Sequence, residues 1–218
     1  MRVSIDTKAK VRIGPFSRRG RARGREAERA ADHDMKADAI LVPAGILEVA
    51  GGQLTIVFGA ARDTADFIAD ALECWWRERK AAHPGIRRLQ IDLDNGPEVA
   101  SNRTQFMKRL IEFADREQLE LELVYYPPYH SKYNPIERGW GVLERHWNGT
   151  LLSTVGTALA WAGTMTWRGL RTLVQRLEGA YKTGVTVAKQ VFKPYAARLE
   201  RSATLPKWSL VIRPIPNR

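Results

Sequence analysis

Cysteine is almost absent from this sequence, and no hydrophobic run is long enough to cross a membrane. The single cysteine, Cys74, excludes an internal disulfide and a zinc cluster, and it suits a reducing compartment such as the cytoplasm. The longest stretch without Asp, Glu, Lys or Arg, 146–167, has 22 residues, many of them Thr, Ser and Gly, and is too polar for a transmembrane helix. We find no signal peptide and no internal repeat, so we expect a cytoplasmic protein without a membrane partner.

Acidic residues are nearly absent from both ends of the chain. Residues 1–25 carry nine Lys and Arg against one acid, and residues 151–218 carry eleven against two. Because the whole chain has a net charge of +11, the middle is left with a net charge of −6. Basic ends around an acidic middle favour a polyanionic partner held at the flanks, although solvated basic tails without such a partner are also common.

The pattern of apolar residues predicts an α/β fold. The 218 residues, 44% of them hydrophobic, suffice for one sizeable core. Alternating apolar residues indicate strands and helical spacing indicates helices, in the order β-β-β-β-α-β-α-β-α followed by further helices. Several strands followed by alternating helices and strands are typical of a mixed sheet flanked by helices.

Four segments bear on a possible site in a first domain of residues 1–150. The segment RVSIDTKAKVRIG predicts two strands joined at a Lys-rich turn, and GILEVAGGQLTIVFG predicts a hairpin. The segment RRLQIDLDNG predicts a strand that ends near Asp94, and a helix is expected from Asn134 to about Trp147.

The remainder of the chain, residues 151–218, is expected to form a helical, basic C-terminal extension. Helices are expected near 153–163 and 168–182, and the segment KWSLVIR predicts a short strand.

Carboxylates stand at the ends of two expected strands. Asp6 lies on the strand face opposite Val3 and Ile5, and Asp94 ends its strand at an Asn-Gly turn. An acid at the end of a core strand is costly unless it is paired or binds a metal. Asp92 shares a strand face with Asp94 and is the alternative to it.

Glu137 begins the next expected helix and allows two interpretations. Asn134 suits the N-cap, which would make Glu137 the third residue of a capping box. Alternatively, Glu137 joins Asp6 and Asp94 in a set of hard oxygen ligands of the kind that Mg²⁺ or Mn²⁺ accepts. Glu144 lies two turns further on, roughly 10 Å along the helix axis, too far to bind the same ions.

The segments SIDTK, LDNGPE and YHSKYNPIERGWG resemble, in this order, the three signature blocks of DDE-type transposases of bacterial insertion sequences. These enzymes are relatives of mariner transposases and retroviral integrases. The resemblance extends over nearly the whole chain and implies a ribonuclease H-like catalytic domain. By position it implies Asp6, Asp94 and Glu137 as the catalytic and metal-binding triad.

The resemblance also implies the chemistry and the partners of this site. Two Mg²⁺ or Mn²⁺ ions would serve an in-line displacement in which water cuts DNA at the element end and frees a 3′-hydroxyl that attacks a target strand. Element ends and target DNA are the implied partners, with a homodimer or higher assembly on DNA. The sequence shows no Ser/His/Asp set that would supply a protein nucleophile.

Residues expected to contact DNA lie in two segments of the chain. The arginines near position 20 suit sequence-independent phosphate contacts, and the residues just before Glu137 would contact the scissile phosphate or a flanking base, although an ordinary loop role fits the latter equally well. Trp140 and Trp147 mark an apolar helix face and are expected in the core. The expected DNA-binding residues are Arg18, Arg19, Arg21, Arg23, His130, Lys132 and Tyr133.

One part of the transposase pattern is missing. Asp6 lies close to the first residue, so we see no upstream helix-turn-helix region that would recognise element ends. We therefore expect an isolated catalytic domain, a truncated gene product or one half of a split reading frame. The alternatives to an active transposase are a non-catalytic DNA-binding remnant and a related ribonuclease H-like nuclease acting on hybrids or junctions.

Overall fold

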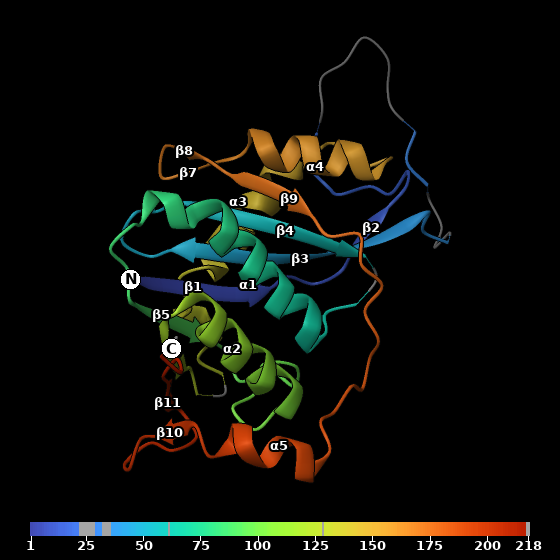
Figure 1. Cartoon of the computed structure of the whole chain (residues 1–218). Coiled ribbons are helices and arrows are strands. Elements are labelled where there is room, and N and C mark those ends of the chain that lie inside the picture. The colour runs from blue at the N-terminus through green and yellow to red at the C-terminus, as the bar shows by residue number, and fades with distance from the viewer. Residues whose placement is uncertain (22–28, 32–35, 61, 128, 217–218) are drawn as a thin grey trace.

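A mixed β-sheet with helices on both faces forms the centre of the molecule (Figure 1). The structure, a computed structural model, describes residues 1–21, 29–31, 36–60, 62–127 and 129–216. The expected order of the first nine major elements is confirmed.

The main sheet has the strand order β10-β11-β6-β5-β1-β3-β4-β9, with β2 paired to β3. Strands β1, β5 and β6 run parallel to one another, whereas β3 pairs antiparallel with both β1 and β4. The strands of this sheet are β1 Arg2–Thr7, β2 Val11–Ile13, β3 Ala39–Glu48, β4 Leu54–Ala60, β5 Arg88–Leu93, β6 Glu120–Tyr125, β9 Leu173–Arg176, β10 Leu199–Arg201 and β11 Ser209–Ile212. A separate small pair consists of β7 Thr166–Trp167 and β8 Leu170–Arg171.

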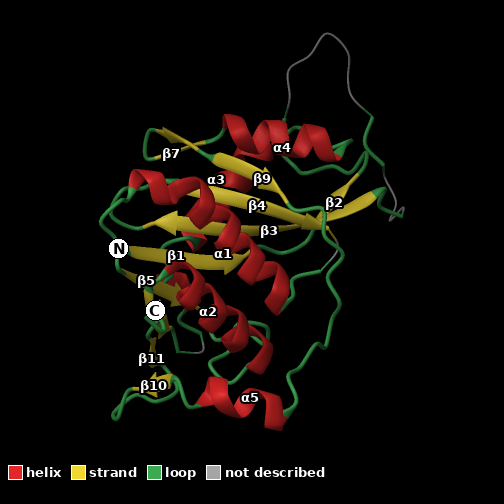
Figure 2. Cartoon of the chain, viewed as in Figure 1, coloured by secondary structure: helices red, strands yellow, loops and turns green. Residues whose placement is uncertain are grey.

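Helices cover both faces of the sheet (Figure 2). Helices α1 and α2 pack on one face, and α3 and α4 contribute to a second core on the other. In the described residues no helix combines the length and apolarity needed to cross a bilayer. The helices are α1 Ala65–Arg79, α2 Thr104–Glu117, α3 Glu137–Trp147, α4 Val155–Thr164 and α5 Lys189–Ala196, with 3₁₀ turns η1 Lys80–Ala82 and η2 Ser131–Tyr133.

The Lys-rich segment between β1 and β2 is a bulge rather than a hairpin turn. Both strands pair with β3: Thr7 lies opposite Ala44, and Val11 lies opposite Leu41. The β1–β2 segment therefore has one residue more than β3 between these two pairs, which is the definition of a bulge. The extra residue moves the apolar side chains of β2 to the other face of the sheet. Val3 and Ile5 of β1 therefore pack in the α1–α2 core, whereas Val11 and Ile13 of β2 pack in the α3–α4 core.

The helix expected over residues 168–182 is wrong. Residues 170–171 and 173–176 form β8 and β9, and β9 extends the sheet by pairing in parallel with β4. The β4 edge offers unpaired backbone groups, and the β-branched Val174 suits a strand. The expected C-terminal strand is confirmed as β11, which pairs antiparallel with β6. The domain boundary at residue 150 stays a prediction, and segments on both sides of it contribute strands to one sheet.

Candidate active site

Three carboxylates from three different elements line one pocket. Asp6 lies near the end of β1, Asp94 directly follows β5, and Glu137 is the first residue of α3. Strands β1 and β5 are parallel neighbours with Ser4 opposite Asp92, so two further residues along each strand bring Asp6 level with Asp94. The pocket has a volume of about 340 Å³ and is lined by Asp6, Thr7, Lys8, Ala9, Asp94, Glu137 and Trp140.

Asp92 takes no part in this pocket. Its carboxylate is fully buried and accepts hydrogen bonds from Arg2 Nε at 2.7 Å and Gln90 Nε2 at 2.8 Å. The hydroxyl of Tyr126 is a third donor at 3.3 Å. Asp94 instead accepts a bond from the Gly96 N–H within the turn and remains partly exposed. Asp92 therefore has a structural role, and the placement of the two acids favours Asp94 as the site residue.

A buried polar network fixes the position of Glu137 relative to β1. The Ser4 hydroxyl donates to Asn134 Oδ1 and accepts from the Ile136 N–H at 3.0 Å. Asn134 Nδ2 donates to the Ile5 carbonyl at 3.1 Å. Ser4 and Asn134 are 0% and 1% exposed, so these bonds have no competition from water. The network ties the loop before α3 to the strand that carries Asp6.

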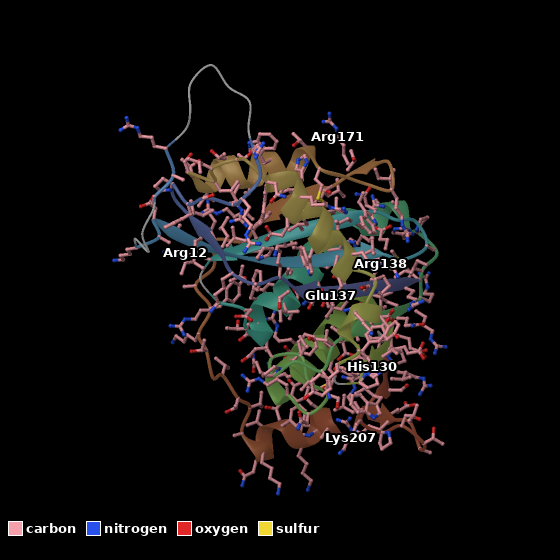
Figure 3. The ribbon with its side chains drawn as sticks, turned by 180° about the vertical axis from the view of Figure 1, so that it is seen from behind. Arg12, His130, Glu137, Arg138, Arg171 and Lys207 are labelled. Carbon is pink, nitrogen blue, oxygen red and sulfur yellow. The ribbon has the colours of Figure 1, made fainter. Side chains whose placement is uncertain are left out.

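The capping-box interpretation of Glu137 is wrong. Helix α3 begins at Glu137, after Ile136 as N-cap, and no side chain caps this helix start. Asn134, the expected cap, bonds to β1 instead, because a buried amide is satisfied better by strand partners than by a helix end two residues away. Glu137 therefore has no capping role; it lines the pocket and lies near the middle of the molecule in Figure 3.

Burial and mutual repulsion raise the pKa values of two of the carboxylates. Burial is the main cause that raises the pKa of Asp6 to about 7; Glu137 and Asp94 raise it further, and a hydrogen bond from Trp140 opposes them. The pKa of Glu137 is also raised, first by burial and then by Asp94, while Lys8 lowers it. The three acids thus share one electrostatic site with excess negative charge.

The donor set fits a divalent cation in its chemistry. Asp6, Asp94 and Glu137 supply the carboxylate oxygens that Mg²⁺ and Mn²⁺ prefer, and a cation would neutralise the repulsion among them. As the side chains stand, no three His, Cys, Asp or Glu residues within the described ranges converge closely enough to form a metal-binding group. The metal site therefore stays a prediction.

Trp140 and Lys8 are pocket residues that were not predicted as site residues. Trp140, expected only in the core, is indeed buried, but its indole N–H also donates to Asp6 Oδ2 at 2.8 Å. Its spacing of three residues from Glu137 on one helix face was the available signal. Lys8 enters the pocket from the β1–β2 bulge, and its Nζ lies 2.6 Å from Glu144 Oε1. A bulge has no comparable signature in a single sequence.

Glu144 belongs to an ion-pair cluster beside the pocket. It pairs with Lys8 and also with Arg18 at 3.3 Å. Burial alone would raise the pKa of Glu144, but the bonds from Lys8 and the charges of Lys8 and Arg18 outweigh it and lower the pKa. Arg18 also stacks over the Trp147 ring at 5.0 Å and is only 14% exposed, so it has a packing role in addition to the expected DNA contact.

The other expected DNA-contacting residues are exposed where they are described. Arg19 and Arg21 are exposed, and Arg23 lies outside the described residues. His130 and Tyr133 stack with ring centroids 5.7 Å apart in the loop before α3, and Lys132 Nζ lies 5.2 Å from the Tyr133 ring. These contacts organise the loop, and the role of its side chains in DNA binding stays a prediction.

Replacing Asp6 with Asn is expected to stabilise the metal-free protein in a pH-dependent way. The pKa of Asp6 is raised from 3.8 to about 7 in the folded protein. Between these pH values the unfolded chain loses the Asp6 proton while the folded chain keeps it, so the free energy of unfolding falls as pH rises. Asp6→Asn removes the charge of Asp6 and can still accept the Trp140 bond. The difference in unfolding free energy between variant and wild type should therefore grow from about pH 4 to pH 7 and then level off, as measured by urea denaturation with a chelator present. A difference independent of pH would contradict the raised pKa.

Comparisons with known proteins identify similar sequences and folds. A family model described as the Rhodopirellula transposase DDE domain matches residues 1–214. The solved structure of a Mos1 transposase paired-end complex with left transposon end is similar with a TM-score of 0.52 and 10% sequence identity, over 73% of this chain and 46% of that chain. This chain thus spans less than half of that transposase, and the likeness confirms the expected ribonuclease H-like fold. A search of curated proteins gives no significant match.

Proposed function

The chain belongs to the family of the Rhodopirellula transposase DDE domain, and we propose that it cuts and joins DNA strands with divalent metal ions held by Asp6, Asp94 and Glu137. The observation that carries this proposal is the meeting of these three carboxylates in one pocket at the ends of β1 and β5 and the start of α3. They are the three acids that the resemblance to transposase motifs implies.

Each pocket residue has a defined part in this proposal. The three carboxylates would hold two Mg²⁺ or Mn²⁺ ions, which when bound supply Lewis-acid activation for in-line displacement at phosphorus. Ser4 and Asn134 hold Glu137 close to β1. Lys8 adds a positive charge to the pocket wall, where it would contact a phosphate oxygen of the substrate.

The face around the pocket supports DNA as the substrate. In the view from behind, Glu137 lies near the middle of the molecule, with Arg138 close to it, Arg171 above, and His130 and Lys207 below (Figure 3). Arg138, Arg171 and Lys207 are exposed. Exposed cations such as these would hold a polyanion by its phosphates while the metal ions act on one of them.

Cleavage of a short DNA duplex tests the proposal. The wild-type chain should nick the duplex with Mg²⁺ or Mn²⁺ but not with chelator, and should join a pre-cut 3′-hydroxyl end to a second duplex. Binding without cleavage would contradict the proposal and identify a non-catalytic remnant. Cleavage of an RNA–DNA hybrid in preference to duplex DNA would contradict it in favour of a ribonuclease H-like nuclease.

Replacing both Arg19 and Arg21 with Ala should weaken DNA binding and reduce its salt dependence. Each lost phosphate contact lowers the slope of log K against log salt by about 0.9, so the double variant should lose up to about 2 from the slope. Fluorescence anisotropy with a labelled duplex at several salt concentrations measures this.

Arg18→Ala is the matched control for this experiment. Because the Arg18 side chain is largely buried against Glu144 and Trp147, its removal should lower thermal stability more than it changes the slope. A double variant of Arg19 and Arg21 with an unchanged slope would mean that these residues face solvent and not DNA.

A further inference from the structure

The indole of Trp140 connects two of the three site carboxylates. Its Nε1–H donates to Asp6 Oδ2 at 2.8 Å, and Trp140 lies one helical turn after Glu137 in α3. The bond therefore joins the strand that carries Asp6 to the helix that carries Glu137. It holds the Oδ2 end of the Asp6 carboxylate, and the backbone N–H of Thr7 also donates to this carboxylate.

The sheet is shaped to admit this ring. Gly45 of β3 lies directly opposite Asp6 in the strand pair. A Cβ atom at Gly45 would lie 2.6 Å from the Trp140 ring, closer than any side chain tolerates. Only a glycine at this position lets the indole lie against β3 and reach Asp6, so the ring has little freedom to move.

Other buried indoles of the chain show that such a bond is not a general consequence of burial. Trp147 lies on the same helix and is fully buried, yet its Nε1 has no hydrogen-bond partner among the described residues. The same holds for Trp75 in α1, whereas its neighbour Trp76 donates to Glu117 Oε2 at 3.1 Å, outside the pocket. The Trp140 indole differs in that it is directed to a carboxylate in the candidate active site.

We propose that Trp140 is a positioning residue that orients the Asp6 carboxylate for metal binding. By holding Oδ2, the indole N–H would fix the rotation of the carboxylate and so keep its oxygens turned toward the pocket in which a cation would bind. This inference rests on the proposed function, because it assigns the orientation of a residue within that site. Donors that orient metal-ligating groups typically change metal affinity or activity 10–100-fold when they are removed.

Mn²⁺ binding without DNA tests this inference. Free Mn²⁺ is counted by electron paramagnetic resonance during titration of the wild-type chain, Trp140→Phe and Trp147→Phe. Both variants lose a buried indole N–H from the same helix, but only the first loses a bond to Asp6. Trp140→Phe should raise the Mn²⁺ Kd about 10–100-fold. Trp147→Phe should change it less than about twofold, although both variants leave a cavity and lower the thermal unfolding temperature.

The outcomes separate the inference from the proposed function. Equal Mn²⁺ affinity in the wild type and in folded Trp140→Phe overturns the positioning role alone. A wild-type chain that binds no Mn²⁺ overturns the metal site and with it the role of Trp140. If Trp140→Phe fails to fold, benzothienylalanine at position 140 keeps the bicyclic shape without the N–H. That variant should then show the same loss of affinity, and wild-type affinity in it would refute the inference.

Discussion

Replacing Asp94 with Asn should reduce Mg²⁺-dependent DNA cleavage by roughly 10²–10³-fold or more, while the protein stays folded. The side chain lies just beyond β5 in the acidic pocket, so Asn preserves its size and its turn bond to Gly96. What is lost is a negative charge at the place where a cation would bind. The rate of nicking of a labelled duplex measures the effect, with thermal unfolding as the check on folding.

Asp92→Asn is the matched control, because Asp92 is two residues earlier on the same strand. It lies opposite Ser4 and is fully buried among Arg2, Gln90 and Tyr126. Loss of this charge should lower stability by about 1–3 kcal/mol but leave cleavage by the folded protein close to that of the wild type. The opposite pattern, with Asp92→Asn inactive and Asp94→Asn active, would show that Asp92 is the site residue.

Glu137→Gln should abolish cleavage without destabilising the metal-free protein. The pKa of Glu137 is raised by burial and by Asp94, so at neutral pH its charge opposes folding. Gln removes this charge, and stability should stay level or rise. Cleavage should fall by orders of magnitude, because the charge at the metal ions carries the chemistry.

Glu144→Gln, two turns further along α3, should give the reverse pattern. Its pKa is lowered by Lys8 and Arg18, so at neutral pH its charge favours folding. The variant should lose about 1 kcal/mol or less, because the side chain is 41% exposed and its ion pairs are partly screened. Cleavage by Glu144→Gln should largely persist.

Near-normal cleavage by Glu137→Gln would refute the assignment of Glu137 to the metal site.

The placement of the three carboxylates in one pocket could be predicted because it depends on two strand ends and one helix start, and each of these has a local sequence pattern. Alternation predicted Asp6 on the strand face opposite Val3 and Ile5, and the structure places Val3 and Ile5 in the α1–α2 core. The pairing of β1 with β5 then follows from the fold that the sequence motifs resemble. Such patterns survive in a single sequence because each is local and repeated.

The contacts around these acids depend on long-range packing and were not predictable. The bond from Trp140 to Asp6 joins residues 134 positions apart and requires Gly45 on a third element to leave room for the ring. Lys8 reaches the pocket from a bulge that shifts the strand register by one residue. Helical spacing in α3 marked Trp140 as a core residue, but it could not show which polar group the indole would meet.

The edge strand β9 and the ion pair of Arg18 with Glu144 were also not predictable from the sequence pattern. Residues 173–176 became a strand because the edge of β4 was open to them, and this preference outweighed their helical spacing. Arg18 was grouped with its basic neighbours, yet Glu144 and Trp147 hold it against α3. In both cases a distant partner decided the structure.

The most direct measurement of the central claim is a crystal structure with Mn²⁺ and data collected at the manganese absorption edge. Asp6, Asp94 and Glu137 are predicted to share anomalous peaks, with carboxylate oxygens about 2.1 Å from the ions. Asp92 should remain bound to Arg2 without a peak beside it. A manganese ion bound elsewhere, or no ion at these three carboxylates at saturating Mn²⁺, would contradict the account.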